Sequence, residues 1–314
     1  KLIKMGSLLF PGQGSQAVGM GKEFYENFSI VKKIFKQADE SLKFPLSELI
    51  LNGPENQLQL TKNTQPAILT VSFSIFSVLK DEFDLKLSSF KYFAGHSLGE
   101  YSALVCSGSL SFKDALFLLH ERGKAMQEAV PVGKGSMIAV LGTETKIIND
   151  LIKLKQDEGI CEIANDNADG QVIVSGNKES VESLQIILKK NKIKFIPLKV
   201  SAPFHCSLMK PAAEVMRDKI NDIKFNNPSF EVVNNVTATP EKNSFIIKKL
   251  LIEQIFTTVR WRESIITMSK AGIKNFVEIG PGKVLSGMIK RTLKDAKCFS
   301  INSITDIKNF KDEF

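Results

Sequence analysis

The chain has 314 residues, of which 43% are hydrophobic and 24% are charged, and its formal net charge is +8. This composition is that of a globular protein with a sizeable core, and it argues against a disordered chain. The lysines are scattered without interleaved aromatic residues, which argues against a nucleic-acid partner. We interpret the positive charge as a solvated surface or as attraction to an acidic partner.

Four cysteines lie far apart in the sequence and only three histidines are present, so we expect no metal site and reduced thiols in a cytoplasmic protein. The most apolar helical stretch, 66–79, is short and carries three serines, so we expect a buried helix and no membrane contact. Residues 1–4 lead directly into an apolar strand, so we expect no signal peptide.

The first predicted strand, 7–10, ends in the glycine-rich loop 11–16. Loops at the ends of strands hold the sites of open α/β sheets, although this loop is equally compatible with a simple turn. No Gly-Lys-Ser/Thr follows it, so it is not a phosphate-binding loop. Amphipathic helices are predicted over 20–60, and residues 63–66 are expected to cap the buried helix that follows.

The segment Gly95-His96-Ser97-Leu98-Gly99 reads Gly-x-Ser-x-Gly between an apolar strand and a helix at 98–107. A nucleophile elbow requires this order, because the serine must sit on a tight strand-to-helix turn with its hydroxyl exposed. The N–H of Leu98 would point at a developing oxyanion. The alternative is a Gly/Ser loop between two elements, and the flanking strand and helix favour a nucleophile at Ser97.

A long helix is predicted over 111–129. From the helix pattern alone, we expect the side chain of Arg122 to lie on the solvent-exposed face of this helix. The pattern then changes over 133–200, where strands and helices follow in the order β-α-β-β-α-β, which is typical of a ferredoxin-like unit. The predicted strands are 136–141, 160–164, 171–175 and 193–200, and the predicted helices are 144–158 and 179–191.

This small unit, 131–200, is expected to be inserted into a larger α/β domain formed by 1–130 and 201–314. In the second part of the large domain, the loop 201–206 leads into a helix at 209–220. Two strands and a closing helix are then predicted at 231–234, 275–279 and 284–293.

A serine nucleophile needs a base, and the chain has three candidates. The side chain of His96 adjoins the serine and should point away from the site, and His120 lies among apolar helix residues, where a structural role is favoured. His205 follows the serine in the order of α/β-hydrolase-like sites, so it is the candidate base by elimination. No carboxylate in the second half stands out as a third member of a triad.

Six motifs in order and spacing together resemble the malonyl-CoA:acyl-carrier-protein transacylases, and the resemblance extends from about residue 7 to 293. These motifs are Phe10–Gln16, Thr64–Ala67, Gly95–Tyr101, Arg122-Gly123, Phe204-His205 and Gly280–Gly282. The resemblance implies an α/β-hydrolase-like large domain with a parallel sheet, together with the inserted ferredoxin-like subdomain.

The resemblance also implies roles for site residues. Ser97 would attack the malonyl thioester, and His205 would take its proton and later activate the thiol of an acyl carrier protein. The N–H of Leu98 and the main chain of Gln13 would form the oxyanion hole. The resemblance further implies that Arg122 would bind the malonyl carboxylate through its planar guanidinium, which would overturn the solvated-face interpretation.

Two further residues acquire roles from the resemblance: Gln65 would line the site near the carboxylate, and Phe204 resembles the malonyl-selective version of related domains. A main-chain carbonyl near 258–261 would hold the imidazole, and Arg260 replaces a glutamine found in many relatives, which leaves a backbone role intact. The substrates would be malonyl-CoA and the acyl carrier protein, with no cofactor and no metal, and we expect a monomer.

Two other functions stay open from the sequence. A serine hydrolase could use the same elbow, although Arg122 and the absent triad acid argue against it. A non-catalytic module that binds carrier proteins is disfavoured because serine, histidine, arginine and glutamine are all in place.

Overall fold

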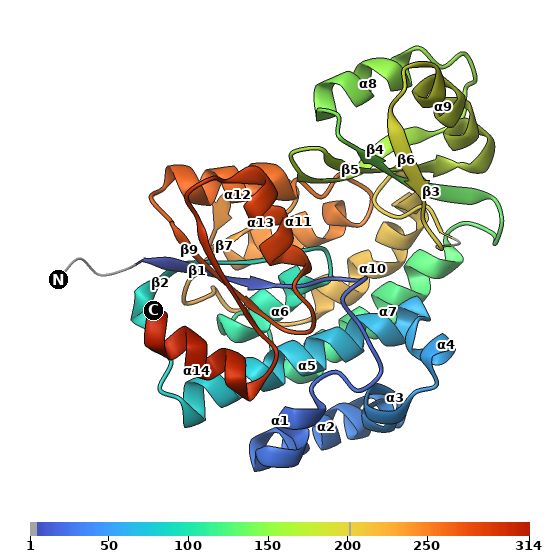
Figure 1. Ribbon diagram of the computed structural model, residues 1–314. Coiled ribbons are helices and arrows are strands. Elements are labelled where there is room, and N and C mark those ends of the chain that lie inside the picture. The colour runs from blue at the N-terminus through green and yellow to red at the C-terminus, as the bar shows by residue number, and fades with distance from the viewer. Residues whose placement is uncertain (1–4, 201) are drawn as a thin grey trace.

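A computed structural model describes residues 5–200 and 202–314 as a mixed α/β fold with two separate sheets (Figure 1). The larger sheet has the strand order β10-β9-β1-β2-β7-β8, in which β8 is antiparallel to β7 and the other pairs are parallel. Its strands are β1 (Gly6–Phe10), β2 (Phe90–Gly95), β7 (Glu231–Val233), β8 (Pro240–Glu241), β9 (Asn275–Ile279) and β10 (Lys297–Ile301).

Helices cover both faces of the larger sheet, as the apolar strands β1 and β2 require. Successive residues of a strand point to opposite faces, so Leu8 and Phe10 pack in the cluster that holds the buried side of α5, while Leu9 packs against Trp261 of α12. The view in Figure 1 shows α12 and α13 on one side of this sheet and α5, α6 and α14 on the other.

The helices lie between the strands in chain order, and two short 3-10 turns accompany them. The helices are α1 (Lys22–Asn27), α2 (Ser29–Leu42), α3 (Leu46–Asn52), α4 (Glu55–Leu58), α5 (Thr61–Glu82), α6 (Gly99–Cys106), α7 (Phe112–Glu128), α8 (Thr145–Lys153), α9 (Lys178–Lys190), α10 (Lys210–Asp222), α11 (Ser244–Gln254), α12 (Trp261–Lys270), α13 (Val284–Thr292) and α14 (Ile304–Glu313), and the 3-10 turns are η1 (Leu87–Ser89) and η2 (Ser207–Met209). No helix within the described ranges combines the length and the apolarity needed to cross a membrane.

The smaller sheet is antiparallel, with the order β4-β5-β3-β6, and its elements follow the predicted β-α-β-β-α-β order. Its strands are β3 (Gly135–Leu141), β4 (Cys161–Ala168), β5 (Gln171–Asn177) and β6 (Lys194–Pro197). Val140 and Val174 pack with α8 and α9 on one face, whereas Met137 and Ile173, on the other face, line a cavity. The face without helices is therefore turned toward the larger sheet.

The prediction that the strand 160–164 ends at residue 164 was wrong. The strand β4 continues through Ala168, which pairs with Gln171 of β5, so only Asp169 and Gly170 form the turn of a tight hairpin. The asparagines at 165 and 167 are consequently strand residues, and both line the same cavity as Met137.

The buried helix α5 begins at Thr61, so the prediction that residues 63–66 cap it was also wrong. Pro66 lies inside the helix and cannot donate to the carbonyl of Lys62. The Nδ1 of His120 lies 3.2 Å from that carbonyl and occupies the place of the missing donor, which agrees with a structural role for His120.

The last elements were not predicted. Both β10 and α14 lie beyond residue 293, and β10 adds a strand to the edge of the larger sheet. In the first half of the chain, α7 matches its prediction, with Ser111 as the N-cap. The expected loop 201–206 begins at residue 201, which lies outside the described part of the chain. Residues 1–4 also lie outside it.

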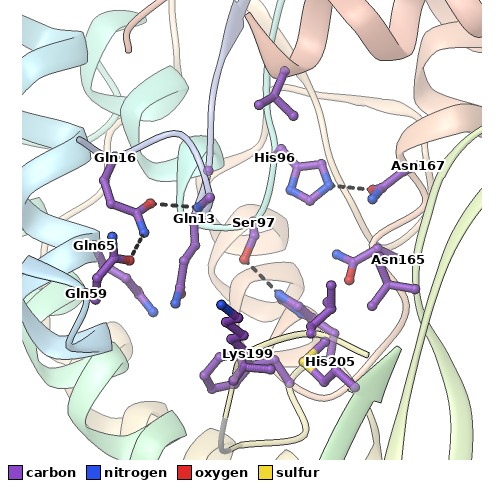
Figure 2. Close-up of a pocket in the computed structure, with 18 of the residues that line it drawn as sticks. Gln13, Gln16, Gln59, Gln65, His96, Ser97, Asn165, Asn167, Lys199 and His205 are labelled. Carbon is purple, nitrogen blue, oxygen red and sulfur yellow. Dashed lines mark hydrogen bonds between the residues drawn. The ribbon is translucent and has the colours of Figure 1, made fainter. Parts of the chain in front are cut away.

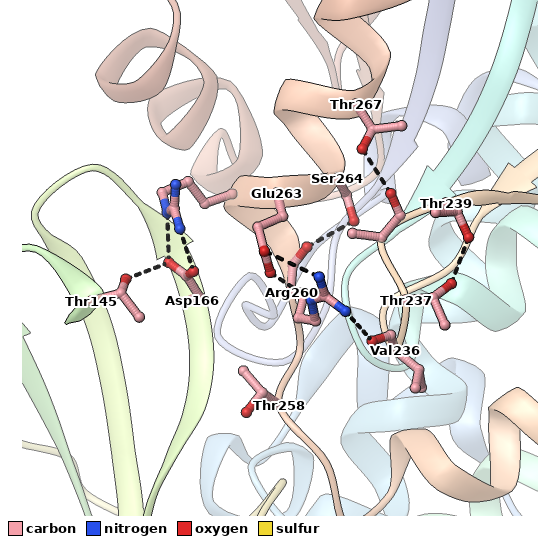
Figure 3. Close-up of polar contacts among 12 residues, drawn as sticks. Thr145, Asp166, Val236, Thr237, Thr239, Thr258, Arg260, Glu263, Ser264 and Thr267 are labelled. Carbon is pink, nitrogen blue, oxygen red and sulfur yellow. Dashed lines mark hydrogen bonds and ion pairs between the residues drawn. The ribbon is translucent and has the colours of Figure 1, made fainter. Parts of the chain in front are cut away.

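The two sheets meet through β4 and the segment before α12. Val259 donates to the carbonyl of Ala164 at 2.8 Å and accepts from the N–H of Asp166 at 3.0 Å. The Asp166 carboxylate accepts from two nitrogens of Arg262, each at 2.9 Å, and from Thr145 at 3.0 Å (Figure 3). A bidentate pair with a buried carboxylate is geometrically specific, so it fixes one arrangement of the two sheets.

Candidate active site

The turn at Ser97 joins β2 to α6 at the carboxyl end of the larger sheet. Ser97 has a φ of 55°, a left-handed conformation that a serine adopts at a cost and that is often found at functional sites. Added Cβ atoms at Gly95 and Gly99 would lie 1.8 Å and 2.2 Å from backbone oxygens. Only glycine therefore allows the strand and helix to approach closely enough to form this turn.

Asn235, just after β7, supports the turn from behind. Its Oδ1 accepts from the Ser97 N–H at 2.8 Å, and its Nδ2 donates to the Gly95 carbonyl at 2.8 Å. Its own N–H donates to the carboxyl group of Glu100 at 2.7 Å, and burial raises the pKa of Glu100 to about 7. The strained backbone of Ser97 is thus held by a fully buried amide.

The hydroxyl of Ser97 lies 2.8 Å from Nε2 of His205, and the two side chains point toward each other in Figure 2. Nδ1 of His205 lies 2.9 Å from the carbonyl of Gln254, which can only accept. Nδ1 therefore carries the proton and Nε2 is free to accept from the serine. Burial, and then the nearby Arg122, lower the pKa of His205 to about 3, which keeps the imidazole neutral.

The guanidinium of Arg122 is fully buried next to the serine. It donates to Ser97 Oγ at 3.1 Å, to Gln65 Oε1 at 2.7 Å and to Gln254 Oε1 at 2.8 Å. Burial lowers its pKa, and within the described part of the chain no carboxylate lies within 4 Å of its nitrogens. The site therefore holds a desolvated cation that is bound by amides rather than neutralised, and it favours an anion.

The remaining predicted residues surround the serine. Leu98 begins the turn into α6, and its N–H has no acceptor among the described residues. Gln13 lies in the loop after β1, where an added Cβ at Gly12 would come within 2.4 Å of the His96 carbonyl, so this loop is packed against the elbow. Phe204 is buried beside His205.

A cavity of about 1040 Å³ opens over the serine, between the loops at the ends of the larger sheet and the helix-free face of the smaller one. Many of its polar lining residues carry amides: Gln13, Gln16, Asn56, Gln59, Gln65, Asn165 and Asn167. Sites of this size hold extended organic ligands. The groups brought together can therefore activate a hydroxyl, stabilise an oxyanion and bind an anionic ligand; no cluster of metal ligands occurs among the described residues.

Two expectations about the histidines need correction. His96 lines the cavity instead of pointing away from it, because its Nε2 bonds to Asn167 Oδ1 at 2.7 Å (Figure 2). The carbonyl that holds His205 belongs to Gln254 and not to the segment 258–261. Val259 uses both backbone groups in the contact with β4, and the Arg260 carbonyl accepts from Ser264 at the start of α12.

Gln254 and Asn235 are the site residues that sequence reasoning missed. Gln254 ends α11, and its Nε2 donates to the carbonyl of Ser97 at 3.1 Å and to Asn235 Oδ1 at 2.9 Å. A helix leaves its last carbonyls without helical partners, but the sequence does not show which of them reaches a distant side chain, so Gln254 gave no usable signal. Asn235 could have been found from the two adjacent asparagines that follow an apolar strand.

Comparison with known proteins places this chain beside the acyltransferases. The model of the acyl transferase domain matches residues 8–312. The malonyl CoA-acyl carrier protein transacylase of Bacillus subtilis (strain 168) is 43% identical over 298 residues, which cover 94% of this chain and 93% of that protein.

Solved structures agree with the sequence comparison. The acyl-carrier-protein-S-malonyltransferase of Bartonella henselae has a TM-score of 0.95 at 40% identity, with 98% of this chain and 99% of that chain covered. A malonyl-transacylase solved in complex with a type II PKS acyl-carrier protein has a TM-score of 0.95 at 38% identity, with 99% and 100% covered.

Proposed function

This chain belongs to the malonyl CoA-acyl carrier protein transacylase family of acyltransferases, and we propose that it transfers malonyl groups from malonyl-CoA to the phosphopantetheine thiol of an acyl carrier protein. The reaction would supply malonyl units to fatty-acid synthesis. The relatives and the transacylase solved with an acyl-carrier protein support the substrate and the partner.

The observation that carries the proposal is the position of Arg122. Its guanidinium contacts the hydroxyl of Ser97 at 3.1 Å while it is completely buried. A carboxylate on the acyl group could take a bidentate pair of hydrogen bonds from it with the carbonyl carbon still next to the serine. An acyl group without a carboxylate would leave the buried charge unpaired, so the site favours malonyl over acetyl groups.

In the first half-reaction, Ser97 Oγ attacks the thioester carbonyl carbon while its proton moves to Nε2 of His205. The N–H of Leu98 and the main chain of Gln13 stabilise the oxyanion, and loss of one such donor typically lowers the rate roughly 10²–10³-fold. The C–S bond then breaks, and the proton on Nε2 passes to the sulfur of CoA. The product is a malonyl ester on Ser97.

In the second half-reaction, the carrier protein's thiol gives its proton to Nε2 of His205, and its sulfur attacks the ester carbonyl. The C–O bond to Ser97 breaks, and the proton returns from Nε2 to Oγ. The carbonyl of Gln254 holds the imidazole throughout and takes the place of a triad carboxylate. The mechanism is therefore ping-pong, with Gln65 and Phe204 lining the site.

The larger architecture also supports this assignment. We propose that 1–130 and 201–314 form an α/β-hydrolase-like domain and that 131–200 form an inserted ferredoxin-like subdomain, which the strand orders of the two sheets support. The cavity between them would hold the pantetheine arm of either substrate. The net charge of +8 favours an acidic carrier protein, and we expect a cytoplasmic monomer without a cofactor.

Intact mass spectrometry tests the nucleophile and the substrate together. After incubation with malonyl-CoA, we expect one malonyl adduct on the wild-type protein and none on Ser97→Ala. Addition of holo acyl carrier protein should remove the adduct much faster than water does. An adduct on Ser97→Ala would overturn the nucleophile assignment, and removal by water at the same rate would favour a hydrolase.

A further inference from the structure

The loop that carries His205 lies between the two sheets, and its backbone is strained. His205 has a φ of 56°, in the left-handed region that a histidine adopts only when its surroundings hold it there. The larger domain contributes the carbonyl of Gln254 to the imidazole. The backbone on either side of the histidine is held by the smaller sheet.

Two side chains of the smaller sheet bind this backbone. Ser175 Oγ donates to the carbonyl of Phe204 at 2.6 Å, directly before the histidine. The carboxylate of Glu162 accepts from the Ser207 N–H at 2.6 Å and from the Ser207 hydroxyl at 3.1 Å, two residues after it. The four-residue segment from Phe204 to Ser207 is therefore fixed at both ends.

The two side chains belong to one cross-strand pair. Glu162 on β4 lies directly opposite Ser175 on β5, and Ser175 in turn lies opposite Met137 on β3. Opposed residues of antiparallel strands point to the same face, which in this sheet is the face without helices. Because of the register of this hairpin, the side chains of Glu162 and Ser175 both point toward the loop that carries His205.

The contact with Glu162 also completes a helix end. Ser207 begins the 3-10 turn η2, which continues directly into α10, and the residue at its N-cap, Cys206, makes no side-chain cap. Free N–H groups at a helix start are stabilised by an acceptor and by negative charge. Glu162 on β4 supplies both the acceptor and the negative charge. The start of this helix, and therefore the neighbouring His205, is thus held in place by a strand of the smaller sheet.

We propose that Glu162 and Ser175 are positioning residues for His205, which hold its loop so that the imidazole reaches Ser97 from the smaller sheet while Gln254 orients it from the larger one. The proposal rests on the role of His205 as the base in the proposed function. It predicts that the removal of either side chain slows proton transfer from Ser97 without changing how malonyl-CoA binds.

A sulfonyl fluoride that labels serine nucleophiles tests the proposal without any acyl substrate. We expect the second-order rate of labelling of Ser97 in wild type to be nearly independent of pH from 6 to 9, because a neutral base is available throughout. In Glu162→Ala we expect a rate about 10-fold or more lower that rises with pH, as activation by the imidazole is replaced by hydroxide. Ser175→Ala should shift in the same direction by a smaller factor.

Three variants act as controls. Glu162→Gln keeps an acceptor for the Ser207 N–H, so its labelling rate should stay within about threefold of the wild-type rate. His205→Ala should give the labelling rate of Ser97 in the absence of a base. Glu158→Ala removes an exposed carboxylate from the same unit and should leave both rate and pH profile unchanged. In the transfer assay, Glu162→Ala should lower kcat with KM for malonyl-CoA within about twofold.

The proposal would be wrong if Glu162→Ala and Ser175→Ala kept the wild-type rate and a flat profile. It would also be wrong if the rate fell with a flat profile and a parallel loss of melting temperature, because that pattern marks a merely structural role. A protein that is labelled at Ser97 in the expected pattern but never carries malonyl would contradict the substrate assignment alone.

Discussion

Two segments meet at the hydrogen bond between Ser97 and His205, and they are held by different parts of the molecule. The contacts of the turn at Ser97 all come from the larger domain: Gly95 and Gly99 pack directly against main-chain atoms, and the side chains of Asn235 and Gln254 bond to its backbone. The loop at His205 is held by side chains and a carbonyl from distant elements, namely Ser175, Glu162 and Gln254. The nucleophile is therefore fixed within the larger domain, whereas the base depends on the arrangement of both sheets.

The turn at Ser97 should tolerate no added atoms. An added Cβ at Gly95 would lie 1.8 Å from the carbonyl oxygen of Gly99, which is backbone and cannot move alone. We expect Gly95→Ala to lower the free energy of unfolding by about 4 kcal/mol or more.

The matched control is Gly287→Ala in α13, where no atom lies within 4 Å of an added Cβ. This change should raise stability by up to about 1 kcal/mol, as for other glycines inside helices. Urea denaturation compares the two variants, and equal stabilities would show that the turn is not held by backbone packing.

Arg122 lies on the nucleophile's side of the site, and its loss should change substrate preference. We expect Arg122→Ala to lower kcat/KM for malonyl-CoA roughly 10²–10³-fold, because a buried charge pair is lost. The value for acetyl-CoA should change by less than about 10-fold. The ratio of the two values within one variant does not depend on the folded fraction, and an unchanged ratio would refute this role.

Glu100 makes stability on the nucleophile's side depend on pH. Burial raises its pKa from 4.5 to about 7 in the folded protein, so the folded state keeps a proton that the unfolded chain releases. Stability from this group is present below pH 4.5 and declines as the pH rises toward 7, by about 3 kcal/mol in all.

Thermal unfolding of wild type and Glu100→Gln from pH 4.5 to 8 measures this decline. The glutamine variant cannot ionise at this position, so its melting temperature should fall less over this range. Parallel curves for the two proteins would mean that folding does not raise the pKa of Glu100.

The smallest expected effect concerns the base. Because the pKa of His205 is lowered to about 3, its imidazole is neutral from pH 5 to 7 and can accept the proton of Ser97 over that whole range. We expect kcat/KM for malonyl-CoA in Glu100→Gln to vary less than about twofold between pH 5 and 7. A fall with an apparent pKa near 6.5 would show that the base is solvated like a free histidine.

The same contrast explains how much could be predicted from sequence. The elbow at Ser97 was predictable because its strand, glycines and helix are adjacent in the chain, and the mixed α/β class followed from the same patterns. The partners of His205 could not be predicted in the same way. One of them is a main-chain carbonyl 49 residues away, and every residue type carries such a carbonyl, so the sequence does not single it out.

The errors in the fold have similar causes. The predicted strand 160–164 stops before the asparagines, yet they belong to it because their side chains reach a polar cavity and their backbone pairs with β5. β10 was missed because its side chains are only partly buried at the sheet edge, so the apolar pattern is weak.

The pairing of Glu162 with Ser175 has a consequence for insertions and deletions. Successive strand residues alternate between faces, so one residue added or removed in β4 between Glu162 and the turn at Asp169-Gly170 would turn its carboxylate toward α8 and α9. The hairpin could still form and the larger sheet would be untouched, yet His205 would lose its anchor. A length change in the segment 154–160, which precedes β4, would leave that register intact, so indels only a few residues apart should have opposite outcomes for activity.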